Sequence, residues 1–571
     1  MSLLRIGTRT SALAMWQARQ VEKLLNEKGV ETKLVGISTS GDRSLGGDLS
    51  SEVGQFIHAV DKQLIDGEID LAVHSSKDVP VKIDDSIDCL AYLERGSKND
   101  VLLFANSDNG ETLQEVLSCQ ESIEIETALN FLPKGSTVGT VSGRRQSFLL
   151  SQRPDLIPLA VRGRVETRLK RLQEGRVDCI VLAEVGLQRL LDAEVLKPWM
   201  LNFRAVRLSH QQWPTAPGQG AISVHCLSKD KQKYSSVRSL LNHQPTEEAV
   251  VHERALLSSV GGGCLYPAGI QVEEQSVTVK ISPENWRTIF CQGRSFPTFH
   301  YDGNLTDLQI TLPEETSETS NDKIEGPKIV STLNSDRLSL LLQSKGIPVV
   351  NQSVVTLSPN YSNWPSQFLD PNSNRSSWPY LVLTSPFAAR CAVEISQKNE
   401  DIKRIQWMAI GEGTARACFR LGVTVSICAQ ARNSKEFAKF IIDKIPKSTP
   451  LLLPRSDLAP SFLNDILTSE GYDVSVWTGY ENQMKSVSTV DIDSEKDTLL
   501  LSSSSSARSW VENALPIPTN ILCMGQSTKE HIETLPEFSQ SVVEVLDGPT
   551  AEFISEWWNK RGENDANTTE N

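Results

Sequence analysis

The sequence has no CxxC pair and no set of His and Cys residues at the spacing of a zinc site. Its ten cysteines are scattered along 571 residues, a pattern typical of reduced thiols inside a cell. No apolar run approaches the roughly 18 residues that span a bilayer, and the N-terminus lacks the apolar core of a signal peptide. We therefore expect a soluble cytoplasmic protein that has no metal centre and binds no membrane.

The sequence also lacks an overall basic character. The formal net charge is -14 and the pI is about 5.3, which argues against a nucleic-acid partner. Any anionic ligand must therefore be bound by a local basic cluster. A chain of 571 residues is too long for one hydrophobic core and suggests roughly three to five domains.

One short stretch combines a strand signal with a charged turn. Ile69–Val73 is typical of a buried strand, and His74–Asp78 would emerge at its carboxyl end, where open α/β sheets bind ligands. Pro80 then closes the turn. Asp78, beside Lys77, is the candidate chemical group. The alternative is an ordinary exit from a strand with a solvated ion pair.

A second candidate site lies near the N-terminus. A strand at Leu3–Ile6, a small-residue turn with Arg9 and Ser11, and a helical pattern over Ala12–Lys28 follow one another. Because a helix N-terminus presents free N–H groups, this arrangement predicts an anion pocket. The alternative makes Ser11 a plain helix cap and Arg9 a surface charge.

Residues 144–189 form a basic segment in an acidic chain. They contain ten cations against five acids, a local excess of five positive charges. The guanidinium fork suits bidentate binding of carboxylates, and Arg164 and Arg168 are one helical turn apart. The prediction is a set of arginines that converge on one cleft; the alternative is a solvated helix face. The cations are Arg144, Arg145, Arg153, Arg162, Arg164, Arg168, Lys170, Arg171, Arg176 and Arg189.

Cys264 follows three glycines, Gly261–Gly263, at the end of a predicted helix. Taken alone, a cysteine is more often a small buried apolar residue than a nucleophile. An exposed, glycine-flanked loop favours an accessible and reactive thiol.

Several motifs in this half occur together in the order and spacing of one known family. From residue 3 to about 305 the chain resembles hydroxymethylbilane synthase, also called porphobilinogen deaminase. The motifs are Leu4–Ser11 with Trp16-Gln17, His74–Pro80, Gly139–Gln146, Arg153–Leu156, Val161–Gly163 with Thr167–Leu169, Pro217–Ala221 and Gly262–Cys264.

This resemblance implies an α/β fold of three domains, in which two lobes are like those of periplasmic binding proteins and the third is a small α+β domain. It also implies a dipyrromethane cofactor joined to Cys264 by a thioether. The expected domains are residues 1–98 with 202–225, residues 99–201, and residues 226–310, the last carrying the cofactor.

The resemblance also assigns roles to individual residues. Asp78 would be catalytic, protonating the leaving amine and stabilising cationic intermediates. The residues expected to hold the cofactor are Lys77, Asp78, Ser11, Ser142, Arg144, Arg145, Arg162 and Gln219. Those expected to bind the carboxylates of the substrate are Arg9, Arg168 and Arg189.

Two departures from the family pattern change the local charge. Glu52–Phe56 replaces a loop that usually carries a lysine, so a cation is lost near Val53. Arg164 stands where the family usually has asparagine and adds one. We hypothesise that Arg164 compensates for the lost lysine; an Arg164→Ala variant that elongates the product normally would exclude this.

The second half repeats itself after a polar, acidic segment, residues 311–328, that reads as a linker. Leu381–Glu394 aligns with Leu499–Glu512 at an offset of 118 residues. Each repeat reads as a strand, a Ser/Thr turn and a helix, followed by a second strand and a Gly-containing turn that begins another helix. That pattern predicts half of a doubly wound sheet, made twice.

This half resembles uroporphyrinogen-III synthase through Thr384-Ser385-Pro386 and Ile410–Ala415, and less closely through Ser503 and Gly525–Thr528. Ser331–Leu333 replaces the usual Thr-Arg-Pro. The resemblance implies two α/β lobes, residues 329–356 with 482–560 and residues 357–481, and a disordered tail, 561–571. Tyr480 would assist loss of the substrate hydroxyl, or would simply pack between the lobes. The expected substrate-binding residues are Thr384, Ser385, Thr414, Ser503, Ser527 and Thr528.

Together the two resemblances imply a bifunctional, monomeric enzyme of tetrapyrrole and heme biosynthesis, a transferase joined to a lyase. It would polymerise four molecules of porphobilinogen to hydroxymethylbilane and then close that product, with inversion of ring D, to uroporphyrinogen III. Two alternatives stay open: an active deaminase with a degenerate C-terminal scaffold, and a two-lobed protein that binds or senses anions.

Overall fold

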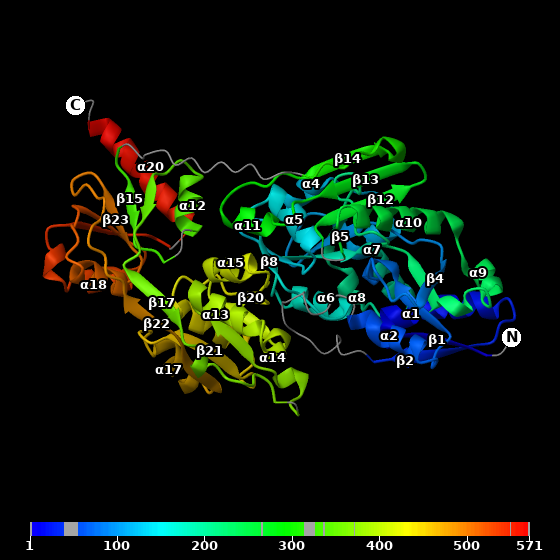
Figure 1. The fold of residues 1–571 in the computed structure, drawn as a ribbon. Coiled ribbons are helices and arrows are strands. Elements are labelled where there is room, and N and C mark those ends of the chain that lie inside the picture. The colour runs from blue at the N-terminus through cyan, green and yellow to red at the C-terminus, as the bar shows by residue number, and fades with distance from the viewer. Residues whose placement is uncertain are drawn as a thin grey trace. The chain divides into compact units, whose positions relative to one another are not determined.

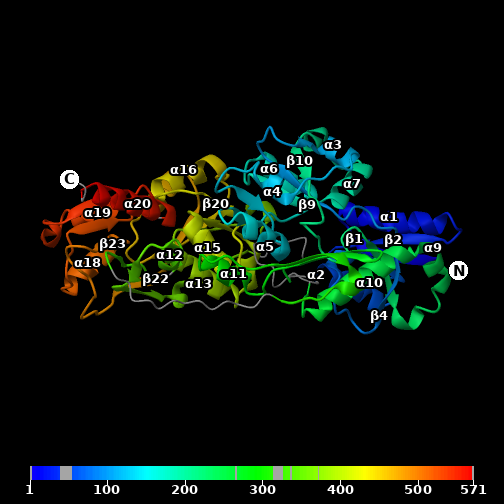
Figure 2. The same cartoon turned by 90° about the horizontal axis from the view of Figure 1, so that it is seen from above.

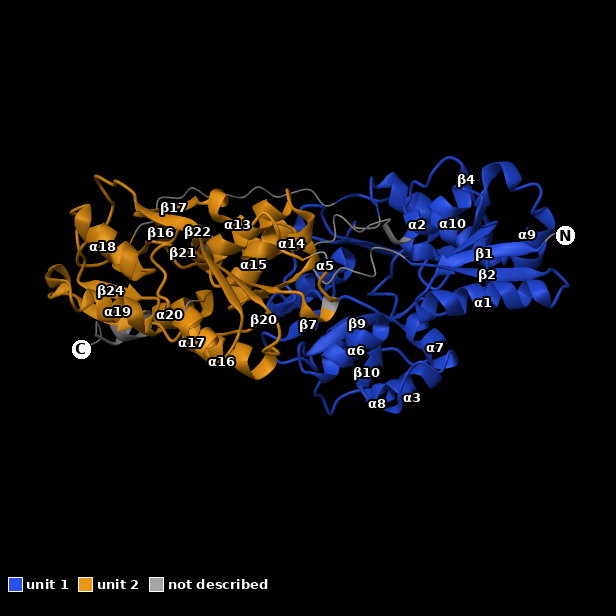
Figure 3. Ribbon diagram, turned by 90° about the horizontal axis from the view of Figure 1, so that it is seen from below, with its two compact units in different colours: residues 1–286, 296–314, 423–427 blue, residues 287–295, 315–422, 428–571 orange. Residues whose placement is uncertain are grey.

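The structure is a computed structural model that describes residues 3–38, 55–263, 266–312, 326–334, 337–370, 372–548 and 550–568. The chain divides into two compact units (Figures 1 and 3). One comprises residues 1–286, 296–314 and 423–427, and the other residues 287–295, 315–422 and 428–571. Within the described residues the strands form five sheets, so the mixed α/β class is confirmed. Every helix in this described part is too short or too polar to cross a bilayer.

The first sheet has the strand order β2-β1-β3-β11-β4. Its strands are β1 (Leu4–Arg9), β2 (Thr32–Ile37), β3 (Leu71–Ser75), β4 (Ile87–Tyr92) and β11 (Ile222–Leu227). Helix α1 (Ala12–Asn26) packs on one face and α2 (Gln55–Ile65) on the other. The alternation of β3 explains this, because Leu71 and Val73 enter one core and Ala72 the other. The ribbon of α1 lies along β1 and β2 in Figure 2.

The second sheet has the order β6-β10-β5-β9-β7-β8. Its strands are β5 (Asp100–Phe104), β6 (Glu111–Thr112), β7 (Thr137–Gly139), β8 (Ile157–Leu159), β9 (Cys179–Ala183) and β10 (Arg204–Arg207). Its helices are α3 (Leu113–Ser118), α4 (Ile125–Leu129), α5 (Gly143–Gln152), α6 (Val165–Gln173), α7 (Glu184–Asp192) and α8 (Pro198–Leu201). The predicted boundary put residues 202–225 in the first domain, but β10 pairs with β5, so residues 204–207 belong to the second sheet. The other boundaries stay predictions.

The third sheet is an antiparallel meander of β12 (Ala268–Glu273), β13 (Ser276–Ile281) and β14 (Phe299–Asn304). Residues 209–221 lead out of the second sheet and back to the first, and Ile270 of β12 donates its N–H to the carbonyl of Thr215 in that segment. The same part of the sequence contains three helices: α9 (Ser235–Leu241), α10 (Gln244–Ser259) and α11 (Trp286–Cys291).

The remaining described residues build two sheets that interleave along the chain. The fourth sheet is parallel, in the order β16-β15-β23-β24-β25: β15 (Ile329–Ser331), β16 (Val349–Asn351), β23 (Thr498–Leu501), β24 (Asn520–Cys523) and β25 (Val542–Val545). The fifth has the order β17-β22-β21-β18-β19-β20: β17 (Val355–Pro359), β18 (Tyr380–Leu383), β19 (Gln406–Ala409), β20 (Ile427–Cys428), β21 (Leu451–Ser456) and β22 (Val474–Met484).

The helices of this half reproduce the repeat that the sequence predicts. Strand β18 leads into α13 (Pro386–Ser396), and β23 leads into α18 (Ser504–Glu512). Strand β19 leads into α15 (Glu412–Arg420), and β24 into α19 (Gln526–Ile532). The other helices are α12 (Arg337–Gln343), α14 (Glu400–Arg404), α16 (Ser434–Lys444), α17 (Phe462–Ser469) and α20 (Ala551–Thr568). In each copy of the repeat a buried strand leads into a helix capped by a serine hydroxyl, Ser385 in one and Ser503 in the other. The two copies therefore fold alike.

The C-terminal tail differs from its prediction. Residues 561–571 were expected to be disordered, but α20 continues to Thr568. Ile554 of this helix is buried in the core that also contains Ile329 and Leu500. Once that buried turn is formed, each added residue extends the helix at little cost. Residues 313–325 of the predicted linker lie outside the described residues.

The turn Pro217–Ala221 is a close contact point in the first unit. Gly218 and Gly220 have φ angles of +75° and +91°, values that L side chains rarely adopt. A Cβ on Gly220 would lie 2.5 Å from the carbonyl oxygen of Gly96. The turn therefore needs glycine both for its backbone conformation and for its packing.

We expect Gly220→Ala to lower the free energy of unfolding by about 2 kcal/mol or more, because the strained φ and the clash with Gly96 add together. Urea denaturation of the full chain measures the change. Gly175→Ala is the matched control, since Gly175 has a φ of +63° and nothing within 4 Å of its Cβ position; it should lose about 1 kcal/mol. Equal losses would contradict the packing argument.

Candidate functional site

The end of β3 presents an exposed carboxylate on a rigid backbone. After β3 the chain makes a short 3-10 turn, Ser76–Asp78, in which Ser76 is buried and Asp78 is exposed. The Ser76 N–H donates to the carbonyl of Ala221 at 3.0 Å, and Arg254 of α10 donates to the carbonyl of Val79 at 3.0 Å. Strand β3 is displaced by two residues from the predicted Ile69–Val73: it begins at Leu71 and includes His74 and Ser75. Asp78 is therefore held in place and free to face a ligand.

Lys77 turns inward from the same loop. Its Nζ donates to Oε1 of Gln219 at 3.3 Å. Burial lowers the pKa of Lys77 to about 8; nearby Arg145 and Arg144 act in the same direction, while Asp78 and Asp100 oppose them. Two of the residues expected to hold the cofactor, Lys77 and Gln219, are thus in contact.

The sequence analysis missed Asp100, which lies at the centre of this region. Its side chain is inaccessible to solvent and accepts hydrogen bonds from Arg144, Arg145, Gln219 and the indole of Trp213 at 2.5–3.0 Å. Burial alone would raise the pKa of Asp100, but the two guanidiniums hold it well below its usual range. The available signal was an acid at the start of a fully buried strand, where an unpaired carboxylate is unfavourable.

Arg144 and Arg145 are nearly buried, with 5% and 10% of their side chains exposed. Helix α5, which carries them, is capped by Ser142, whose hydroxyl accepts the N–H of Arg145 at 3.4 Å. Besides Asp100, Arg144 donates to the carbonyl of Pro214 and Arg145 to that of Val181. Much of their donor capacity is therefore used inside the protein, and their contact with a cofactor, like that of Ser142, stays a prediction.

Several arginines of the basic segment form an electropositive cluster around Arg168. Arg162 is buried, and Arg168 of α6 donates its Nε–H to the carbonyl of Gly163 at 2.9 Å. Burial lowers the pKa of Arg168 to about 10, assisted by repulsion from Arg145, Arg162 and Arg171 and opposed by Asp78. Neighbouring guanidiniums that destabilise the charge of Arg168 favour an anion beside it. The structure thus brings Arg168 into electrostatic range of Arg145, Arg162 and Asp78.

The predicted residues nearer the N-terminus lie around α1 and α7. Arg189 of α7 donates to the carbonyl of Gly220 at 2.7 Å and stacks on Trp16, 5.4 Å from the ring centre. Burial lowers the pKa of Arg189 to about 10. Ser11 caps α1 by accepting the N–H of Ala14, and Arg9 is the last residue of β1. Substrate binding by Arg9 and Arg189, and cofactor binding by Ser11, stay predictions.

Two sequence features lie outside the described residues: Cys264, and the part of the Glu52–Phe56 loop before Gln55. Arg164 is described, exposed, and stands at the N-cap of α6. Its hypothesised compensation for the missing loop lysine is therefore still untested.

The described residues fit a cofactor that carries several carboxylates. Arg145, Arg162 and Arg171 add positive charge around Arg168, which lies within electrostatic range of the exposed Asp78. Among the charges that act most strongly on the pKa of Arg168, three are arginines and one is the acid Asp78. A polyanion would relieve the mutual repulsion of these cations, whereas a neutral or cationic group would not.

In the C-terminal half the structure brings Ser385 and Tyr480 together. Ser385 caps α13 by accepting the N–H of Ala388, and its hydroxyl is 2.8 Å from that of Tyr480. The Tyr480 ring packs against Phe387 at 5.1 Å, and burial raises the pKa of Tyr480. Thr384, at the end of β18, is half-buried. A protonated phenol beside a capping serine can donate one hydrogen bond to a ligand oxygen.

The other predicted hydroxyls are divided between exposed and buried positions. Ser503 caps α18 by accepting the N–H of Ser506 at 3.2 Å, and Ser504 donates to the carbonyl of the exposed Ser527 at 3.3 Å. The bond between Ser504 and Ser527 joins the N-termini of α18 and α19. Thr414 and Thr528 are 3% and 4% exposed, so their hydroxyls lie inside the protein. Their contact with a substrate stays a prediction.

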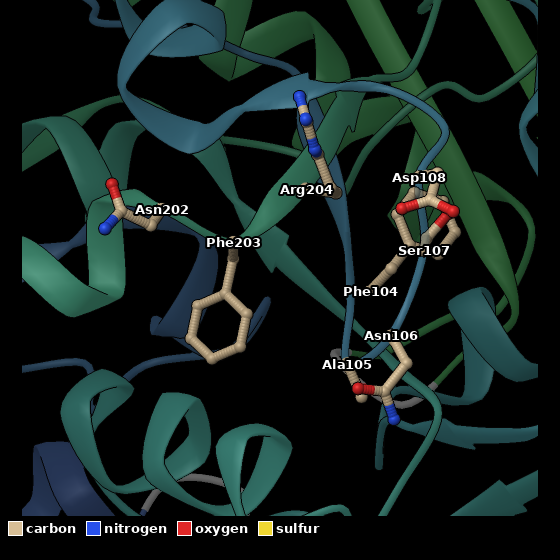
Figure 4. A pocket seen from close by; sticks show the side chains of 8 residues that line it. All are labelled: Phe104, Ala105, Asn106, Ser107, Asp108, Asn202, Phe203 and Arg204. Atoms are coloured by element: carbon tan, nitrogen blue, oxygen red, sulfur yellow. The ribbon is translucent and has the colours of Figure 1, made fainter.

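A separate pocket of about 540 Å³ lies near the start of β10 and the end of β5. Asn106, Asp108, Asn202 and Arg204 give it a polar lining around Phe203 (Figure 4). None of the predicted site residues lines it, so it is not the predicted site.

The first unit is thus a three-sheet α/β protein with a guanidinium cluster near an exposed carboxylate, an arrangement suited to binding polycarboxylates. Comparison with known families gives the assignment. Residues 4–235 match the family model described as "Porphobilinogen deaminase, dipyromethane cofactor binding domain", and residues 336–545 match that of "Uroporphyrinogen-III synthase HemD". The chain belongs to the porphobilinogen deaminase family and carries a uroporphyrinogen-III synthase domain in its second half.

Individual relatives agree with this assignment. The chain is 36% identical over 282 residues to the porphobilinogen deaminase of Geobacter sulfurreducens, covering 48% of this chain and 80% of that protein. It is 38% identical over 272 residues to the deaminase of Xanthomonas euvesicatoria, covering 47% and 80%. The crystal structure of a uroporphyrinogen-III synthetase from Helicobacter pylori matches 41% of this chain and 99% of that one, with 16% identity and a TM-score of 0.29, which adds nothing to the assignment.

We expect the amine of Lys77 to become reactive toward an acylating reagent with a midpoint near pH 8, because burial and the two arginines favour its neutral form. Peptide mass spectrometry after brief labelling across a pH series gives the midpoint. Lys233 is the internal control: its hydrogen bond to Tyr234 raises its pKa, so its midpoint should lie above pH 10.5. A Lys77 midpoint that coincides with that of Lys233 would contradict the predicted environment.

Proposed function

We propose that this chain condenses four molecules of porphobilinogen into hydroxymethylbilane, with release of ammonia, and then closes that product to uroporphyrinogen III. The observation that carries the proposal is the exposed carboxylate of Asp78 within electrostatic range of Arg168, whose pKa is lowered by burial and by the neighbouring Arg145, Arg162 and Arg171. Porphobilinogen has two carboxylates, so each added unit brings anions that these cations can neutralise. The chain is thus a bifunctional enzyme of tetrapyrrole biosynthesis, a transferase joined to a lyase.

The dipyrromethane cofactor, when bound, supplies the primer to which the units are added. Cys264 would hold it through a thioether, and Lys77, Ser11, Ser142, Arg144, Arg145, Arg162 and Gln219 would surround it. The arginines of this set bind carboxylates bidentately. Lys77 adds a point charge below about pH 8, where its amine is protonated.

Asp78 would act where positive charge develops. As ammonia leaves the aminomethyl carbon of porphobilinogen, the pyrrole ring becomes cationic. In its protonated form the carboxyl group can transfer a proton to the leaving amine, and the carboxylate that results then stabilises the positive charge on the ring. The rigid turn Ser76–Asp78 holds this group without the reorganisation that a mobile loop would require.

The second half would act on the linear product. Tyr480 would donate its phenolic proton to the departing hydroxyl, with Ser385 fixing the orientation of the phenol. Free hydroxymethylbilane closes spontaneously to the symmetric isomer I. Linking the synthase to the deaminase raises the effective concentration of the second site near the product. We further propose that the chain works as a monomer in the cytoplasm. The nine described cysteines are free thiols, which is typical of a protein in a reducing compartment.

Incubation of the purified chain with porphobilinogen alone, followed by oxidation and separation of the uroporphyrin isomers, tests both activities. We expect mainly isomer III. Tyr480→Phe should slow cyclisation roughly tenfold or more and shift the product toward isomer I, with unchanged consumption of porphobilinogen. Tyr472→Phe is the matched control, because Tyr472 donates only to the helix carbonyls of Ile441 and Ile445.

Isomer I alone from the unaltered chain would show that the second half is not a synthase. No porphyrin from protein that carries the cofactor would exclude the deaminase.

Asp78→Asn should lower the turnover of porphobilinogen by roughly a hundredfold or more, since a neutral amide stabilises developing positive charge poorly. Intact mass should still show the cofactor in this variant and its loss in Cys264→Ser. Asp84→Asn is the control for removing one carboxylate nearby, because Asp84 only accepts bonds from Ser86. Normal turnover in Asp78→Asn would exclude the role given to Asp78.

A further inference from the structure

Asp100 lies outside every predicted role, yet its contacts reach the chemical site. We propose that Asp100 is a positioning residue for the deaminase reaction: through Gln219 it orients Lys77, and by direct ion pairs it fixes Arg144 and Arg145. This inference rests on the proposed function for its effect on turnover. Its geometric basis is independent of that function.

Asp100 and its partners come from three separate places in the first unit. Arg144 and Arg145 come from α5, and Trp213 and Gln219 come from the segment that leads from the second sheet to the first. Asp100 itself begins β5 of the second sheet. The carboxylate thus ties the second sheet to the turn that packs against Ser76.

The two oxygens of Asp100 are fully used by donors. Oδ2 accepts from Arg144 at 2.7 Å, from Arg145 Nε at 3.0 Å and from the indole of Trp213 at 2.9 Å. Oδ1 accepts from Arg145 Nη2 at 2.5 Å and from the amide nitrogen of Gln219 at 3.0 Å. Only a group with acceptors on both sides and no hydrogen satisfies these five donors.

This arrangement fixes which end of the Gln219 amide faces Lys77. Its nitrogen is committed to Asp100 and to the carbonyls of Lys98 and Asn99. The oxygen must therefore point the other way, where it accepts from Lys77 Nζ at 3.3 Å. The carboxylate of Asp100, together with these two carbonyls, thereby determines that an acceptor, rather than a donor, faces the lysine.

An asparagine at position 100 would reverse this order. To satisfy Arg144, Trp213 and the Nε of Arg145, its oxygen must take the place of Oδ2. Its NH2 group would then face the NH2 group of Gln219, and two donors would oppose each other. If the Gln219 amide turned over to relieve this, its oxygen would face the carbonyls of Lys98 and Asn99 and its nitrogen would point at the ammonium of Lys77. In either case the contact between Gln219 and Lys77 is disturbed.

The charged groups that shape the environment of Lys77 act together. Asp78 beside it and Asp100 behind Gln219 favour its ammonium form, whereas Arg145 and Arg144 disfavour it. Arg254 of α10 is bonded to the carbonyls of Val79 and Pro80 in the same loop. Removing the charge of Asp100 subtracts one of the two favourable contributions and leaves the unfavourable ones.

The decisive experiment compares Asp100→Asn with Asp155→Asn in the full chain. Asp155 is a matched control, because it too pairs with an arginine, Arg153, at 2.8 Å, and accepts the N–H of Gly135. Both variants lose an arginine-paired carboxylate, but only Asp100 is connected to Lys77. Lys77 labelling across a pH series, cofactor loading by intact mass, and kcat and KM for porphobilinogen are measured on each.

For Asp100→Asn we expect the Lys77 labelling midpoint to move down by roughly half a pH unit or more. We also expect kcat to fall roughly tenfold to a hundredfold, with a smaller change in KM. Asp155→Asn should change neither. A Lys77 midpoint and a kcat equal to those of the unaltered chain would overturn the proposal.

Gln219→Met keeps the inference testable if Asp100→Asn does not fold, because it leaves the ion pairs of Asp100 intact and removes only the connection to Lys77. It should lower the Lys77 midpoint in the same direction. An unchanged midpoint in Gln219→Met would reject the connection. The labelling measurement needs no substrate. A chain that makes no hydroxymethylbilane would therefore refute the proposed function, while the Lys77 midpoints would still test the positioning role of Asp100.

Discussion

The packing around Lys77 and Asp78 in the first unit depends on a buried negative charge, that of Asp100. A carboxylate without access to solvent is tolerated only when donors surround it, and Asp100 has five at hydrogen-bond distance. Meeting that requirement brings α5, the 209–221 segment and the start of β5 to one point. The glycines of the Pro217–Ala221 turn then allow the backbone to approach Gly96 and Ser76. The positions of Lys77 and Asp78 follow from this packing.

The same constraint separates two kinds of arginine that look alike along the chain. Arg144 and Arg145 spend most of their donors on Asp100 and on main-chain carbonyls. The charges that act most strongly on Arg168 are those of other arginines and of the exposed Asp78. In an acidic chain with a net charge of -14, positive charge is thus concentrated where a polycarboxylate can neutralise it. Arg144 and Arg145 thus hold the structure together, whereas Arg168 and its neighbours attract the anionic ligand.

The second half uses a different device. Two similar strand-helix units place a capping serine at the end of a buried strand, Ser385 in one sheet and Ser503 in the other. Only one of these serines meets a tyrosine, because β22 runs beside β21 and carries Tyr480 to the end of β18. The two copies of the repeat therefore differ in chemistry, because only the copy with Ser385 places a phenol beside its capping serine.

The sequence by itself determined the class and most of the architecture. Periodicity and turn residues predicted the strand at Ile69–Val73, the repeat of 118 residues and the helices that follow, because burial of alternate residues is a local property. Motif order predicted the families of both halves, which the comparisons confirmed. The pairing of β10, the helical end of α20 and the role of Asp100 needed the tertiary structure. Each depends on partners distant in sequence: Asp100 is 119 residues from Gln219, and no local pattern shows which buried charge will meet which donor.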